Sequence, residues 1–387
     1  MSMNATQYNI VFPLAKKDTY EANDTVDFVL SLENKKLVPG SLAICGDACI
    51  YKDKSAQAPF TSQDTDGYID PDAGYHSLFR DFTTEFRAIG LTESFSYYPR
   101  YVKMKTQGTM LRDSLGVETF NCIEGKAMNE TIRMGLNMGV KSDDNLPPSA
   151  VPFVVKPDIA PNKSNVGIPG NQVGVVRIRC RLAPDGEVIY GDAADGNSGY
   201  QIKNLELRYE TVDDDGSREP LTMEVYQVNR QVIETNNANL STFVPGLCDA
   251  VHMSFIPTAD ESDTSGKKNY LRCATITGTP ILGSNASVTQ GASRLYYAIN
   301  DTDTALVGFT MQSRSEMLWN YLRSWSNEPK NYAAILARIE DEDAYGLGIN
   351  FGSPLDFSNQ QFAVEIDSNV SAAHSAYLYF RGTRTYQ

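Results

Sequence analysis

The chain has 387 residues, which exceeds what one hydrophobic core usually organises and favours two domains, or three. Its 41% hydrophobic and 21% charged residues are ordinary for a globular protein and exclude a disordered chain. The net charge of −14 excludes a generic electrostatic grip on nucleic acid, which would need clustered Lys and Arg.

The N-terminal residues and the cysteines narrow the class of protein further. Residues 1–18 contain no basic segment followed by a long apolar stretch, and no run approaches the ~18 apolar residues of a membrane span. We therefore expect a soluble chain without a signal peptide or membrane insertion. Because no cysteines form a CxxC pair, neither a zinc site nor a disulfide framework is expected. We expect small buried side chains in strands at Cys45, Cys49, Cys122, Cys180, Cys248 and Cys273.

Alternating hydrophobicity predicts strands in the first half. Residues 25–32 alternate apolar and polar side chains, the period-two pattern of a strand with one buried face. Residues 176–182 alternate more sharply, and three arginines face away from the apolar side chains. Such a stripe could pair with carboxylates of a neighbouring molecule or with partners in the same chain, and the sequence leaves both open. The three residues are Arg177, Arg179 and Arg181.

Segments with mixed patterns lie between these strands. Residues 76–90 fit either a helix or a strand. Residues 93–104 have a weak helical pattern that Pro99 interrupts. Residues 200–212 again alternate as a strand, and the acidic, turn-rich stretch 213–220 after them contains both Gly and Pro. We place a domain boundary in that stretch.

The second half repeats a turn of the first. Val-Pro-Gly at 38–40 returns at 244–246, each time after a polar stretch that contains asparagine. The recurrence indicates two similarly built β-domains in tandem, although three residues can also recur by chance. The clearest helix is predicted at 313–325, with a capping box at its start and an apolar stripe. Ser313 and Glu316 form the box, and the stripe is Leu318, Tyr321, Leu322 and Trp325.

The last segments indicate that the chain finishes within a sheet. Residues 361–367 alternate as a strand with one buried face. Residues 377–380 carry large side chains on both faces, which is typical of a central strand covered on each side. Many short strands, proline- and glycine-rich turns and few helices favour a pair of antiparallel sandwiches over a parallel α/β sheet.

Candidate catalytic and metal-binding residues are sparse. The three histidines, His76, His252 and His374, are isolated, and no GxSxG, HExxH or phosphate-binding glycine motif is present. Histidine-based catalysis and a copper or zinc site are therefore not expected. The consecutive acidic residues 341–343 suggest a glycosidase, but such a run is more often a solvated loop than a carboxyl pair in an apolar cleft.

An acidic loop at 62–74 is a possible calcium site. Four aspartates cluster around Gly67, loosely like an EF-hand loop. The match fails at the positions that matter, because Ser62 stands at the first ligand position and Ala73 stands where a bidentate Glu is needed. A solvated acidic loop is the alternative that we favour. The aspartates are Asp64, Asp66, Asp70 and Asp72.

The whole chain resembles the double jelly-roll major capsid proteins of tailless icosahedral DNA viruses, including bacteriophages. The resemblance rests on residues 154–191, where a Pro-x-x-x-x-Asn-Lys-Ser loop leads into a long strand, and on 200–216, which is similar to the last strand of the first roll. It also rests on 345–368 and 375–386, like the closing strands of the second roll, and on 26–41. These similarities are patterns along the chain, and no single motif is diagnostic.

The resemblance implies an all-β fold of two tandem eight-stranded antiparallel jelly-roll sandwiches with a few short helices. The first roll would span 1–212, a linker 213–220, and the second roll 221–387. It implies no enzyme activity, cofactor or metal, and a homotrimer that forms a pseudo-hexameric capsomer of an icosahedral shell around DNA. Implied partners are neighbouring capsomers and minor or vertex proteins, without sequence-specific nucleic acid. The location would be the virion, with assembly in the host cytoplasm.

Several expectations follow for the surface. Loops 53–74 and 258–270 are expected to cap the outer surface of the capsomer, while residues 8–17 are expected to contact neighbours or the particle interior. A receptor- or glycan-binding spike, or a minor vertex protein, is the main alternative. An enzyme built on paired jelly rolls, such as a glycan amidase or a copper monooxygenase, is a third class.

Overall fold

The computed structural model consists mainly of strands in two layers. It describes the following residues: 6–58, 60, 68–70, 72–109, 132–133, 151–191, 194, 196–217, 219–234, 238–243, 246–261, 269–271, 292–299, 309–311, 314–325, 346–357, 361–368 and 373–386.

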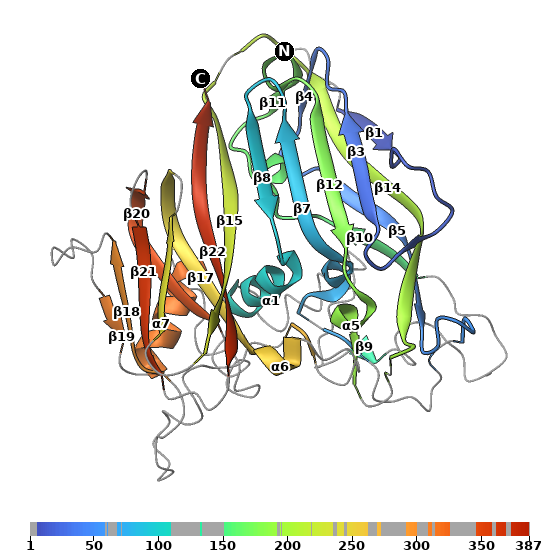
Figure 1. Cartoon of the computed structure of the whole chain (residues 1–387). Helices are drawn as coiled ribbons and strands as arrows, with labels where there is room; N and C mark the ends of the chain where they lie inside the picture. The colour runs from blue at the N-terminus through green and yellow to red at the C-terminus, as the bar shows by residue number, and fades with distance from the viewer. Residues whose placement is uncertain are drawn as a thin grey trace.

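The first half is a sandwich of two sheets (Figure 1). In one layer β14 (Gly199–Asp213) pairs with β5 (Ala43–Tyr51), which pairs with β10 (Val151–Val155), while β1 (Gln7–Val11) also pairs with β14. The facing layer has the order β8 (Leu91–Phe95), β7 (Phe79–Phe86), β12 (Val176–Leu182), β3 (Thr25–Leu30). Short strands extend the β14 layer: β2 (Tyr20–Glu21), β4 (Lys35–Leu37) and β11 (Ile168–Pro169). Three others form a small separate sheet in the order β13 (Ile189–Tyr190), β6 (Tyr68–Ile69), β9 (Ile132–Arg133).

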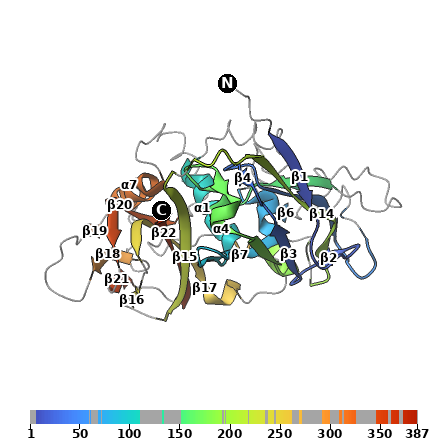
Figure 2. The ribbon, with the colours of Figure 1, turned by 90° about the horizontal axis from the view of Figure 1, so that it is seen from above.

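The second half repeats this arrangement. One layer has the order β20 (Leu347–Asp356), β17 (Leu247–Pro257), β22 (His374–Tyr386), β15 (Leu221–Ile233). The other has β16 (Ala238–Phe243), β21 (Gln361–Ser368), β18 (Ala292–Ile299), β19 (Phe309–Met311). Seen from above, the two sandwiches stand side by side (Figure 2). The predicted tandem double jelly roll is thus confirmed, whereas eight strands per roll and the 213–220 boundary stay predictions.

The repeated turn lies at equivalent places in the two halves. Gly40 has a φ of +70° and precedes β5, and Gly246 has a φ of +81° and precedes β17. Since β5 pairs with β14 and β17 pairs with β22, each glycine leads into the strand beside the last strand of its own half. A positive φ is the conformation that glycine adopts without steric cost. Val244 and Pro245 lie outside the described residues.

The helices are short and lie at the ends and between the halves. They are η1 (Gly74–Leu78), α1 (Tyr98–Thr109), η2 (Ala160–Asn162), α4 (Gly170–Val173), α5 (Asp185–Val188), α6 (Thr258–Glu261) and α7 (Arg314–Trp325). None of those described is both long and apolar enough to cross a membrane.

The structure settles the helical predictions. The predicted helix at 313–325 is confirmed as α7, with Tyr321, Leu322 and Trp325 buried, although Ser313 lies outside the described residues. The prediction at 93–104 was wrong in its limits, because strand β8 runs to Phe95 and α1 begins at Tyr98. Pro99 then stands in the first turn, where its missing N–H costs nothing. Residues 79–86, left open above, are strand β7 after a 3-10 turn.

The hydrophobic core is continuous between the halves. The larger buried cluster joins Phe95 and Tyr101 of the first half to Tyr226 and Tyr379 of the second. A smaller cluster fills the second sandwich alone. Strand β22 is central and residues 375–380 are buried, which confirms the prediction of a strand covered on both faces. The cysteines in the described part of the chain, Cys45, Cys49, Cys180 and Cys248, are buried and free as predicted.

Candidate functional site

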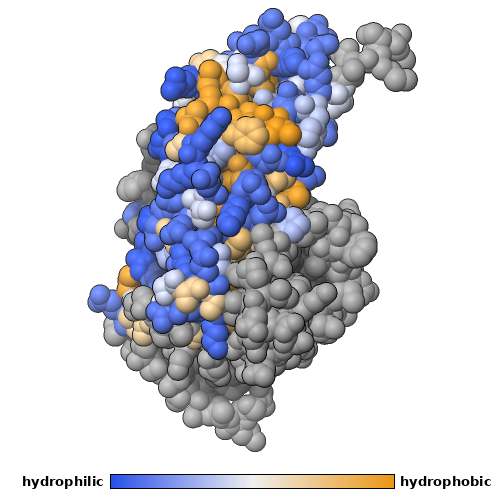
Figure 3. All heavy atoms as spheres, turned by 90° about the vertical axis from the view of Figure 1, so that its right-hand side faces the viewer, coloured by the Kyte–Doolittle hydropathy of each residue, from blue (hydrophilic) through white to orange (hydrophobic). Residues whose placement is uncertain are grey.

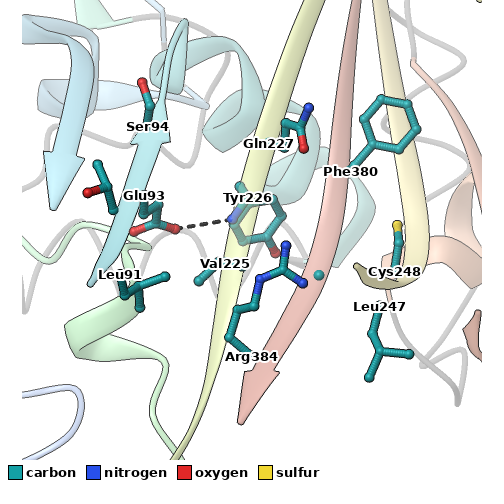
Figure 4. A pocket seen from close by; sticks show the side chains of 12 residues that line it. Leu91, Glu93, Ser94, Val225, Tyr226, Gln227, Leu247, Cys248, Phe380 and Arg384 are labelled. Atoms are coloured by element: carbon teal, nitrogen blue, oxygen red, sulfur yellow. Dashed lines mark hydrogen bonds between the residues drawn. The ribbon is translucent and has the colours of Figure 1, made fainter. Parts of the chain in front are cut away.

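The two halves meet along a seam between β8 and β15. These strands are parallel and share one bridge, Gln227 with Ser94, so few main-chain bonds hold the layer together here. The Glu93 side chain supplies the missing acceptors. Its Oε1 accepts the N–H of Tyr226 at 3.1 Å (Figure 4), and its Oε2 accepts the N–H of Ala160 at 2.8 Å. One buried carboxyl thus ties together β8, β15 and the start of η2.

A groove of about 240 Å³ follows the seam. Figure 4 shows side chains from β8, β15 and β22 around it. Leu247, at one wall, is 42% exposed. The lining residues are Leu91, Thr92, Glu93, Ser94, Val225, Tyr226, Gln227, Leu247, Cys248, Phe380, Gly382 and Arg384.

Aromatic rings fill the interior of the seam. The ring of Phe95 stacks on that of Tyr226, with 4.8 Å between centroids. Tyr101 donates its hydroxyl proton to the Tyr226 oxygen at 2.7 Å, and Tyr226 donates to Glu224 at 2.8 Å. Because each buried hydroxyl has a partner, the large apolar rings can pack across the seam without an unsatisfied polar group.

A buried cation crosses the same seam. Arg100 of α1 is fully buried, and its guanidinium lies 5.0 Å from the ring centroid of Tyr270 and 4.7 Å from that of Tyr377. It donates to Ser254 Oγ at 3.3 Å and to the carbonyl oxygen of Tyr270. Since α1 belongs to the first half and these partners to the second, Arg100 fixes one half against the other.

Burial dominates the electrostatics of the seam. Burial raises the pKa of Glu93 to about 8, against two backbone hydrogen bonds that lower it. Burial opposes ionisation of Asp158 too, but Lys105 at 2.5 Å and Lys163 at 3.0 Å hold the pKa of Asp158 well below its usual range. The seam therefore contains one compensated carboxylate and one carboxyl that favours its proton.

The histidines lie on separate elements. His76 Nδ1 is 2.8 Å from the hydroxyl of Tyr98. His252 stacks on Trp325 with 3.7 Å between centroids, and its Nδ1 is 3.0 Å from Ser324 Oγ. Burial holds the pKa of His252 well below its usual range. His374 begins β22. Within the described ranges, no three His, Cys, Asp or Glu side chains gather as a metal cluster.

The acidic loop departs from the favoured prediction of a solvated loop. Asp70 and Asp72 are 1% and 2% exposed, and Lys103 Nζ lies 2.6 Å from Asp70 Oδ2. Asn269 donates to the same oxygen at 2.7 Å. The expectation of solvation was wrong for these two residues because a lysine of α1 is buried beside them. Asp64, Asp66 and the acidic run 341–343 lie outside the described residues.

The arginine stripe is paired within the chain. Arg177 Nε and Arg179 Nε lie 3.1 Å and 3.0 Å from one oxygen of Asp27, on the adjacent strand β3. Arg181 donates to the Asn23 side-chain oxygen at 3.3 Å. These contacts favour the intramolecular alternative.

An apolar surface lies on the outer face of the first half. Tyr8, Ile10, Phe12 and Leu14 alternate outward and are 58%, 46%, 56% and 63% exposed. Figure 3 shows apolar residues gathered in the upper part of this face. Exposed patches of this kind mark interaction sites more often than single exposed residues do.

The fold is similar to those of solved viral capsid proteins. The Faustovirus major capsid protein has a TM-score of 0.60 at 8% identity, over 98% of this chain and 90% of that one. The PBCV-1 virus capsid has 0.56 at 10% identity, over 98% and 94%. The mavirus major capsid protein has 0.51 at 10%, over 97% and 86%. No protein-family model matches the sequence, and no curated protein matches it significantly. The likeness confirms the double jelly-roll fold of viral major capsid proteins.

The sequence analysis missed the seam residues. For Glu93 a signal existed, because Leu91, Glu93 and Phe95 share one face of a period-two pattern and so place a carboxyl among inward side chains. Arg100 had no comparable signal, since its partners lie more than 150 residues away in sequence.

Proposed function

We propose that this protein is the major capsid protein of a tailless icosahedral virus. Three copies would form a pseudo-hexameric capsomer, and capsomers would tile a shell that encloses DNA. The observation that carries the proposal is the repeated strand order of two sandwiches fixed side by side by one core. Support comes from the match of nearly the whole chain to capsid proteins with the same fold.

The repeat explains why three is the expected number of copies. A ring of three chains, each with two similar rolls, presents six similar lobes, and six lobes pack with six neighbours in a plane. Cyclic contacts of this kind are head-to-tail and close at the third copy. An obligate trimer would bury well over ~2,000 Å² of apolar surface.

The rigid seam fits this role. A shell subunit transmits load between neighbours, so its two rolls must keep one relative orientation. Buried contacts of Glu93, of Arg100 and of the rings around Tyr226 support one fixed orientation. The described parts of loops 53–74 and 258–270 also meet, through the hydrogen bond from Asn269 to Asp70. This contact supports the proposal that both loops cap the outer surface together.

The proposal also covers the activity, location and partners of the protein. The protein would act by assembly and would not be an enzyme, and it would be located in the virion after assembly in the host cytoplasm. Minor or vertex proteins would be further partners. The net charge of −14 supports a shell that encloses DNA without a sequence-specific grip on it.

Light scattering on the purified recombinant protein tests the proposal. We expect a species with three times the mass of the 42.7-kDa chain, together with larger closed particles. Trimers that never form larger particles would indicate a spike instead. A monomer at all concentrations would rule out both.

A further inference from the structure

Large and small side chains are sorted on the outer face around β14. On the β1 side, Tyr8, Ile10 and Phe12 project outward and about half of each side chain is exposed. On the β5 side, the positions on this face are small, and two of them are covered almost completely by their neighbours: Ser41, and the buried Ala43 and Cys45. Between the two lies β14, with Glu206, Arg208 and Glu210 outward.

The register aligns the large residues with the small ones. Arg208 pairs with Ile10 on one side and with Ala43 on the other. Glu206 pairs with Cys45, and Phe12 follows Val11, which pairs with Leu207 and ends the strand. Ile10 therefore has a small residue, Ala43, at its own level one strand beyond β14, and continuing the same spacing would bring Phe12 to the level of Cys45.

The small residues line a hollow. A groove of about 400 Å³ lies over β5, with Tyr8 at its β1 side and Val154 and Lys156 at its far side. The walls and floor also include Val38, Pro39, Gly40, Ser41, Ala43, Cys45, Arg208 and Glu210. A ridge and a groove thus lie next to each other on one face.

Strand β1 also has an open edge. Among the strands of the described chain, its main-chain partner is β14 on one side. An edge strand that carries exposed apolar side chains is a template for association with another chain. The ridge therefore favours a protein partner, and the adjacent groove indicates which one.

We infer that this face binds the same face of a second copy of the chain across a two-fold axis that runs along β14. Rotation about that axis exchanges the two sides of the strand. Ile10 of one copy then meets Ala43 of the other, and Phe12 meets Cys45, twice by symmetry. An isologous contact requires a surface that is complementary to itself. Here the ridge on the β1 side and the groove over β5 lie at equal distances from the axis, on opposite sides of it.

The charges on the axis limit the strength of this contact. Arg208 is already bonded to Glu206 in its own chain, and Glu210 follows on the same face. Because residues on the axis face their own counterparts, the two Arg208 guanidiniums lie between four carboxylates, those of Glu206 and Glu210 from both copies. The central strip is thus polar with an excess of negative charge, and the flanking apolar contacts must supply the affinity.

The contact is distinct from the three-fold contacts of the proposed capsomer. It rests on the proposed function only for its place in a shell, where it would join two neighbouring capsomers. The contact rests on few side chains of each copy, so we expect a dissociable contact whose occupancy rises with concentration.

Crosslinking through the natural Cys45 tests the inference. In the full chain, Phe12→Cys places a thiol two strands from Cys45, roughly 9–10 Å away, too far for a bridge within one molecule. A mild disulfide oxidant such as diamide should therefore join two chains. Because the two-fold contact is reciprocal, the product on a non-reducing gel should be a covalent dimer and nothing larger.

Two controls accompany the crosslink. Adding Cys45→Ser to Phe12→Cys should abolish the dimer. Val232→Cys, at a position 43% exposed in the second half, should give at most a trace of it. A ladder that reaches covalent trimers would show a head-to-tail ring contact and overturn the two-fold arrangement. No crosslink at concentrations where the native protein associates would overturn it as well.

A second variant measures the contact without new thiols. Phe12→Ser removes an exposed ring, so the fold should be retained while two-fold association weakens by on the order of tenfold or more. If the proposed trimer is correct, this variant should still form trimers but fewer particles. Loss of trimers only in Phe12→Ser would assign the ridge to the three-fold contact and contradict the inference. If the native protein forms no trimers while Phe12→Cys still gives the Cys45 crosslink, the proposed function alone would be rejected.

Discussion

Glu93 of β8 accepts the backbone N–H of Tyr226 of β15 at 3.1 Å. A side chain thus takes the place of a main-chain hydrogen bond between the two rolls. A second backbone donor, the N–H of Ala160, binds the other carboxyl oxygen at 2.8 Å. Substituting Glu93→Ala would leave both donors buried and unsatisfied, at about 1–3 kcal/mol each. We expect a free energy of unfolding lower by about 2–6 kcal/mol, measured by urea denaturation. Thr92→Ala, at an exposed position of the same strand, is the control and should change it by less than about 0.5 kcal/mol.

The pH dependence of stability should carry the signature of Glu93. Burial raises its pKa to about 8 in the folded protein, from a usual value of 4.5. The folded state therefore binds a proton that the unfolded state has released between these pH values, and stability falls as pH rises from about 5 to about 8. Glu187, whose pKa burial raises to about 7, contributes in the same direction. Denaturation of Glu93→Gln at several pH values should show a shallower decline. An unchanged decline would mean that Glu93 is ionised in the fold.

Arg100 should be needed for the two halves to pack. Arg100→Ala would remove a buried guanidinium from between Tyr270 and Tyr377 and leave a cavity. Truncating a large buried side chain to alanine typically costs about 2–5 kcal/mol. Arg100→Met, which fills the space without the charge, should recover part of that loss. Thermal unfolding followed by near-UV circular dichroism would report it, because the packed aromatic side chains of the fold give that signal. Equal stability of the alanine variant and the native protein would refute the role.

The repeated turn predicts a conformational cost at Gly40. Its φ is +70°, and an added Cβ would meet nothing closer than 4.0 Å, so Gly40→Ala tests the backbone alone. We expect a loss of about 1–2 kcal/mol, the cost of the left-handed region for a residue with a Cβ. At Gly246 the added Cβ would also meet the Arg384 guanidinium, and the loss should be at least as large. Chemical denaturation of both variants gives the comparison, and a neutral Gly40→Ala would contradict the assigned turn.

The sequence patterns predicted the fold well but not the side chains at the seam between the two rolls, because they report only local structure. Period-two alternation and turn residues are local signals, and they located β3, β12, β14 and the central position of β22. The Val-Pro-Gly repeat indicated a tandem fold because the same backbone turn is needed twice. The boundaries at 93–104 failed because a proline that interrupts a helix interior is tolerated at its first turn.

Contacts between distant segments could not be predicted in the same way. Arg100 meets residues of β17 and of the loop at 269–271, and Lys103 neutralises Asp70; neither pairing leaves a periodic trace in the sequence. The acidic loop was therefore interpreted as solvated although two of its aspartates are buried. The outward ridge at Tyr8 to Leu14 was predicted only as part of a segment that contacts neighbours or the particle interior, because its register with β5 depends on β14.

The most direct test of the central claim is electron microscopy of the purified native protein. If the chain is the building block of a shell, class averages of the smallest assembly will show a three-fold symmetric ring with six lobes, two from each chain, and larger fields will contain closed particles tiled by that ring. Images that show only single two-lobed molecules, at concentrations far above those of the light-scattering experiment, would contradict the account.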